Sequence, residues 1–156
     1  MVNKKELFVE LDEKFSETKE KLGFKASLDD IDGVYFVRDM ILDCGYVSDD
    51  FARQMCGRMV STYYSWVGQF QAWLTPGMGS VINHNEVKSL DEADIESVKA
   101  LTHRAMYFFR ADKVTGVNHD WKKMGELVDE MVDGQKDFFE KLAVLLDKVA
   151  IGWKED

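Results

Sequence analysis

The sequence predicts an all-α fold: a bundle of about five helices, with long third and fifth helices, forming a single helical domain over residues 1–156. Three observations support this prediction. The only proline is Pro76, so long stretches can run as uninterrupted helix. Apolar residues recur at spacings of three and four, and capping residues and glycines separate these periodic stretches. A chain of 156 residues, 46% of them hydrophobic, is long enough to bury a substantial core.

Caps and glycines mark the first two helices. Asn3 can cap a helix that runs to about residue 22, and Gly23 ends it. Ser27 caps a second helix that continues to Gly45, with acidic residues favourably placed in its first turn. The apolar row of the first helix consists of Leu7, Phe8, Leu11, Phe15 and Leu22.

The third helix is expected to start at Ser48 and continue to about residue 74. It carries two apolar rows, which indicates burial either between neighbouring helices or against a second subunit. Its aromatic residues fit a core at helical spacing or, alternatively, a ligand-binding surface. The rows are Ala52, Cys56, Val60, Tyr63, Val67, Phe70 and Leu74, and Phe51, Met55, Met59, Trp66 and Trp73.

Two further helices follow a connection at residues 75–88, which is expected to be a functional lid or a mobile loop. Ser89 and Glu92 form a capping box that opens a fourth helix, ending at about Lys113. Asn118 caps a fifth helix that reaches about residue 151, with a heptad seam broken only at Gln135. This seam fits a long helix packed on its own chain or a dimer interface. Its members are Trp121, Met124, Val128, Met131, Gln135, Phe138, Leu142, Leu145 and Val149.

The formal charge of −9 limits the classes of partner. An acidic surface repels the phosphate backbone, so nucleic acid is not expected as a partner, and anionic membranes are disfavoured for the same reason. Cys44 and Cys56 sit in apolar helical contexts and are expected to be buried thiols in a reducing compartment. The charged N-terminal segment does not resemble a signal peptide, and no apolar run approaches membrane-spanning length, so we expect a cytoplasmic protein.

The most suggestive chemical feature is an acidic line on the apolar helix expected after Ser27. At about 100° per residue, Asp32, Asp39 and Asp43 point within about 20° of one direction, with Asp29 about 60° away. These carboxylates require water, a cation or a basic partner.

The first helix offers a second acidic line, which contains Glu10 and Glu13. Two such lines facing each other could bind Mg²⁺ and position a metal-bound triphosphate. The candidate metal ligands are therefore Asp29, Asp32, Asp39, Asp43, Glu10 and Glu13.

The segment DDID at residues 29–32, the apolar helix that follows, and YVSDDFA at residues 46–52 resemble the all-α MazG-like nucleoside-triphosphate pyrophosphohydrolases. The resemblance covers about residues 6–56. It matches Asp29 and Asp32 to a Glu-x-x-Asp pair that opens an apolar helix in that family, and Glu10 and Glu13 to part of an upstream acidic cluster. It implies Mg²⁺-dependent hydrolysis between the α- and β-phosphates of a nucleotide.

Two functional hypotheses follow. The favoured one is a self-associating or protein-binding module without a cofactor, because the apolar faces of the third and fifth helices exceed what a short chain is expected to cover. The alternative is the Mg²⁺-dependent nucleotide hydrolase. No catalytic residue is assigned under either hypothesis.

Overall fold

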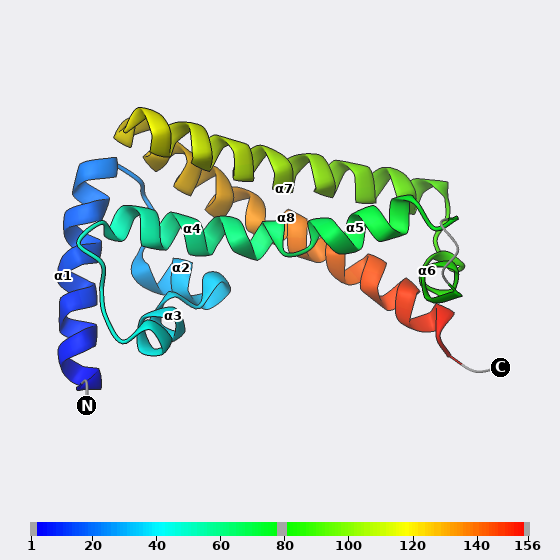
Figure 1. Ribbon diagram of the computed structural model, residues 1–156, viewed down its shortest axis with the longest axis horizontal. Coiled ribbons are helices and arrows are strands. Elements are labelled where there is room, and N and C mark those ends of the chain that lie inside the picture. Colours follow the sequence, from blue (N-terminus) through cyan, green and yellow to red (C-terminus); the bar gives the residue numbers. More distant parts are fainter. Residues whose placement is uncertain (1–2, 78–80, 155–156) are drawn as a thin grey trace. The chain divides into compact units, whose positions relative to one another are not determined.

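The computed structural model describes residues 3–77 and 81–154, and this part of the chain is helical without any strand (Figure 1). The all-α prediction is confirmed. The number of helices is larger than the predicted five, because two predicted helices are interrupted and the predicted connection contains a helix. The helices are α1 (Lys4–Leu22), α2 (Leu28–Tyr35), α3 (Val37–Cys44), α4 (Phe51–Tyr64), α5 (Val67–Leu74), α6 (Val81–Val87), α7 (Glu92–Asn118) and α8 (Trp121–Gly152).

α1 follows its predicted bounds because its capping residues act as expected. The Asn3 side chain accepts a hydrogen bond from the backbone N–H of Lys5 at 3.0 Å. Gly23 adopts a left-handed conformation with φ 79°, and its N–H bonds back to the carbonyl of Lys19. Both ends of α1 were therefore readable from local sequence.

The predicted third helix is interrupted between α4 and α5. At the break, the N–H of Trp66 donates to the carbonyl of Tyr63 at 3.2 Å, a tighter turn than the α-helical pattern. Ring contacts hold both sides of the break: the Phe138 ring centroid lies 4.8 Å from that of Tyr63 and 6.2 Å from that of Phe70. We attribute the break to this aromatic packing, which outweighs the local preference for a straight helix.

The caps of α7 and α8 lie two residues later than predicted. Asp91 and Asp94 form the reciprocal capping box of α7, with N–H to carboxylate distances of 2.9 and 2.8 Å, in place of the predicted Ser89 and Glu92. α7 also runs past Lys113 and includes Asn118. The carboxylate of Asp120 accepts from the N–H of Lys123 at 3.1 Å, so Asp120, rather than Asn118, caps α8.

The predicted connection at residues 75–88 contains the short helix α6, so describing it as a loop was wrong for residues 81–87. The indole N–H of Trp153 donates to the Glu86 carboxylate at 2.6 Å. A Cβ added at Gly152 would meet the carbonyl oxygen of Asn85 at 2.8 Å. These contacts fix α6 against the C-terminal end of α8.

The chain divides into two compact units, and each is described by itself. The described residues of unit 1 are 3–62 and 108–134, and those of unit 2 are 63–107 and 135–154. The prediction of one domain over residues 1–156 stays a prediction.

Unit 1 contains α1 packed against α3, with the short helices α2 and α3 following each other (Figure 1). The C-terminal end of α1 approaches the backbone of α8, where a Cβ added at Gly125 would collide with the carbonyl of Leu22. The Tyr35 hydroxyl donates to the carbonyl of Met131 at 2.9 Å, and the N–H of Lys25 donates to the Asp129 carboxylate at 2.9 Å.

Unit 2 is held by aromatic packing around Phe138 and by ion pairs between α7 and α8. The Lys148 ammonium lies 2.8 Å from each carboxylate oxygen of the buried Asp94. Arg104 pairs with Asp137 at 3.1 Å.

The long apolar seams are largely buried within a single chain. In α8 the buried seam residues include Met124, Val128, Met131, Phe138, Leu142 and Leu145. In α4 and α5 they include Phe51, Met55, Cys56, Met59, Tyr63, Phe70 and Trp73. The expected surplus of apolar surface on these two seams is therefore absent, and they provide no reason for a second subunit.

The two cysteines differ in exposure. Cys56 is fully buried, and burial raises the pKa of its thiol strongly. Cys44 is exposed, so the expectation of two buried thiols was wrong for this residue. Within the described residues, no helix has the length and apolar character needed to cross a membrane.

Candidate functional site

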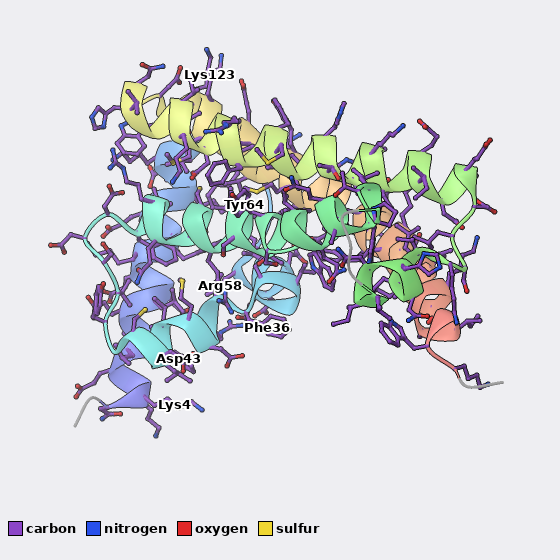
Figure 2. All side chains as sticks on the ribbon, turned by 45° about the vertical axis from the view of Figure 1, so that its right-hand side comes forward. Lys4, Phe36, Asp43, Arg58, Tyr64 and Lys123 are labelled. Atoms are coloured by element: carbon purple, nitrogen blue, oxygen red, sulfur yellow. The ribbon has the colours of Figure 1, made fainter. Side chains whose placement is uncertain are left out.

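The predicted acidic line does not follow one helix, because Phe36 ends α2 and begins α3 in a left-handed conformation with φ 55°. Asp29 and Asp32 therefore lie on α2, and Asp39 and Asp43 on α3. Figure 2 labels Phe36 and Arg58. The carbonyl of Tyr35 accepts a hydrogen bond from Nε of Arg58 at 2.8 Å, in place of the backbone bond that a continuous helix would give it. Side-chain hydrogen bonds thus replace the backbone bonds that an uninterrupted helix would make.

Arg38 forms ion pairs with the carboxylates of Asp29 and Asp32. Its Nη2 lies 2.7 Å from Asp29 Oδ1, and its Nη1 lies 3.0 Å from Asp32 Oδ2. The backbone N–H of Arg38 also donates to Asp32 Oδ1 at 2.8 Å, which caps the first turn of α3. The hydrogen bond to Asp29, and then that to Asp32, raise the pKa of the Arg38 guanidinium. The chain itself therefore supplies a cation for this predicted pair.

The remaining predicted ligands are exposed and lie on different helices: Asp39 and Asp43 on α3, and Glu10 and Glu13 on α1. Among residues 3–77 and 81–154, no three histidine, cysteine, aspartate or glutamate side chains gather in a group that could hold a metal ion. The Mg²⁺ site and the nucleotide hydrolase that depends on it stay predictions, without support from this geometry.

One part of the predicted acidic set lies in a shallow depression on α1. We call Glu6, Val9, Glu10 and Glu13 the acidic strip; they line the depression with Lys5 beside them. Their spacing of three, four and seven residues places them on one helix face. Val9 is 59% exposed, so an apolar side chain lies in solvent among carboxylates.

A second shallow depression lies on the C-terminal half of α7. We call Arg110, Lys113, Val114 and Val117 the basic strip; they line this depression together with Asn118. Val114 and Val117 are 55% and 79% exposed. The charged groups of Arg110 and Lys113 lie 5.2 and 5.4 Å from the ring centroid of Phe109, within the range of cation–π attraction.

Sequence reasoning missed the basic strip because it ended the fourth helix at Lys113. The extra turns of α7 place Val114 and Val117 on the same face as Arg110, with the same spacing of three, four and seven residues as in the acidic strip. Recognising Asp120 as the N-cap of α8 would have shown that α7 can extend as far as Asn118.

Comparisons with known proteins return no match: no family model fits the chain, and neither the curated proteins nor the solved structures contain a significant match. The resemblance to the MazG-like pyrophosphohydrolases is not tested by these comparisons and stays a prediction.

Proposed function

We propose that this chain is a self-associating helical module, in which the basic strip of one copy binds the acidic strip of another. The observation that carries the proposal is the opposite charge of two exposed strips whose residues have the same helical spacing. Each strip places one or two solvent-exposed valines beside charges of one sign on one helix of unit 1, and Lys5 lies beside the acidic strip in the same depression.

Charge complementarity identifies a second copy as the occupant of each strip. The chain has a net charge of −9, so the two neighbouring positive charges of Arg110 and Lys113 form a local basic region on an acidic protein. Opposite potentials steer two surfaces together and set their register, whereas the apolar centre provides most of the affinity. Burial of Val9 against Val114 and Val117 would supply that centre.

The contact joins two different surfaces, so it is heterologous. Such contacts produce closed rings where the rotation between copies closes, and extended chains where it does not. The association is therefore expected to depend on protein concentration and to proceed beyond a dimer.

Sedimentation velocity on four samples tests the proposal. Wild type is expected to associate at micromolar concentration, whereas Arg110→Glu with Lys113→Glu, and Glu10→Lys with Glu13→Lys, are each expected to sediment as monomers. An equimolar mixture of the two double variants is expected to associate again, because each retains the strip that the other has lost.

Two matched controls carry the same change in net charge outside the strips. They are Lys99→Glu with Lys136→Glu, and Glu126→Lys with Glu130→Lys, all at exposed positions. Both controls are expected to associate as wild type does. A wild type that remains strictly monomeric, or a mixture that stays monomeric while wild type associates, would contradict the proposal.

A further inference from the structure

A third depression in unit 1 is a pocket of about 400 Å³ beside the α7–α8 turn. Arg53 and Gly57 of α4 form one wall, and residues of α7 and the turn form the other. The α7 and turn residues that the argument uses are Asp112, Lys113, Gly116 and His119. Pockets of this size are typical of small-molecule sites.

The guanidinium of Arg53 is anchored at the pocket wall. Its Nε lies 3.2 Å from the Asp50 carboxylate, and its Nη2 donates to the carbonyl of Gly116 at 2.9 Å. The same Nη2 lies 3.5 Å from Nδ1 of His119. Its Nη1 has no acceptor within the described residues, so one edge of the fork keeps its hydrogen-bonding capacity for a ligand.

Lys113 supplies a second positive charge to the same pocket. No carboxylate lies within ion-pair distance of its ammonium group in the part of the chain that the structure describes.

Asp112 is the one carboxyl among the pocket-lining residues, and it is half-buried. Its carboxyl accepts no hydrogen bond from the described residues. Burial raises its pKa, and the opposing attraction of Lys113 and Arg53 is smaller. The pKa of this carboxyl is therefore higher than that of an ordinary aspartate.

We propose that this pocket binds a small oxyanion of the phosphate class, held by Arg53 and Lys113 with His119 at its edge. The planar guanidinium of Arg53 offers donors that match the oxygens of a phosphate group, and Lys113 lies in the opposite wall of the pocket. Asp50 pairs with Arg53 and Asp112 lines the pocket, so the negative charge of the ligand is met chiefly by Lys113 and by the free edge of the Arg53 guanidinium. The glycines leave the pocket open, because a Cβ added at Gly57 or Gly116 would meet no other atom within 4 Å.

The inference is separate from self-association, although Lys113 belongs to both sites. The test titrates the whole chain with inorganic phosphate at constant ionic strength and follows the amide resonances of Gly57, Gly116 and His119 by NMR. Saturable shifts are expected with phosphate and not with chloride at the same ionic strength.

Variants identify the groups that bind. Arg53→Gln and Lys113→Gln are each expected to weaken phosphate binding at least tenfold, whereas Lys99→Gln, an exposed cation outside the pocket, leaves it unchanged. Asp112→Asn is expected to retain or tighten binding, because it removes the only carboxyl among the lining residues. If Arg53→Gln fails to fold, Lys113→Gln tests the same inference by itself, because Lys113 takes part in no ion pair among the described residues that the substitution could break.

Three results would overturn the inference: no saturable shift in wild type, equal weakening by Lys99→Gln and Lys113→Gln, or loss of binding in Asp112→Asn. The Glu10→Lys, Glu13→Lys variant separates this site from self-association, because every pocket residue is intact. Its affinity for phosphate is expected to equal that of wild type, and a loss there would also contradict the inference.

Discussion

Gly125 shows how one missing side chain determines the packing of a helix. The C-terminal end of α1 lies so close to α8 that a Cβ at this position would collide with the carbonyl of Leu22. The obstacle is backbone rather than a flexible side chain, so a side chain there would require one of the two helices to move.

Gly125→Ala is therefore expected to lower the free energy of unfolding by about 2 kcal/mol or more, despite the better helix propensity of alanine. Gly33→Ala is the matched control within α2, because a Cβ there meets no atom within 4 Å. It is expected to raise the free energy of unfolding by about 0.5–1 kcal/mol. Urea denaturation measures both, and equal stabilisation by the two substitutions would show that α1 does not approach α8 this closely.

At the same scale, Phe36 shows why the candidate site was only partly predictable. The sequence correctly identified Ser27 and Gly45 as the limits of this helical region, because capping residues act locally. It placed no break at Phe36, since aromatic residues rarely adopt left-handed backbone angles. The break depends on Arg38 and Arg58, which bond to groups distant along the chain or on the preceding helix.

At the scale of elements, the start of α7 links a helix cap to an ion pair. The Asp94 carboxylate accepts the N–H of Asp91 and also binds the Lys148 ammonium of α8. The hydrogen bond from Lys148, followed by that from the Asp91 backbone, lowers the pKa of Asp94. The sequence predicted a cap in this region two residues too early, because Ser89 and Glu92 satisfy the same local pattern and only the contact with α8 selects Asp94.

This arrangement predicts a specific pH dependence of stability. A carboxyl with a folded-state pKa below its unfolded value of about 3.9 stabilises the fold above that pH, and the stabilisation is lost as the pH falls through the folded-state pKa. Acidification below about pH 4 is therefore expected to reduce the free energy of unfolding more steeply for wild type than for Asp94→Asn.

Urea denaturation at a series of acidic pH values measures the difference. Asp147→Asn, which removes an exposed carboxylate of α8, is the control and is expected to follow the wild-type curve. Parallel curves for wild type and Asp94→Asn would refute the role assigned to Lys148.

At the scale of the whole molecule, the structure changes which surfaces we propose for association. The long seams of α8 and of α4 and α5 attracted attention in the sequence because they are the most periodic, but they are largely buried within one chain. The acidic and basic strips have ordinary composition and become noticeable only when exposure is known. Hydrophobic periodicity therefore predicted the core well and gave no indication of the surfaces that we propose for association.

Association through charged strips is expected to weaken with salt. The Debye length falls from about 10 Å at 0.1 M to about 3 Å at 1 M ionic strength, which screens exposed charges. The weight-average mass of wild type, measured by sedimentation at fixed protein concentration, should decrease over this range. A mass that is constant or rises with salt would indicate an apolar interface in place of the strips.

The close approach at Gly125 has a consequence for the search for relatives. Any homologue that keeps this junction must place glycine at the fifth residue of its last long helix, whatever else has diverged.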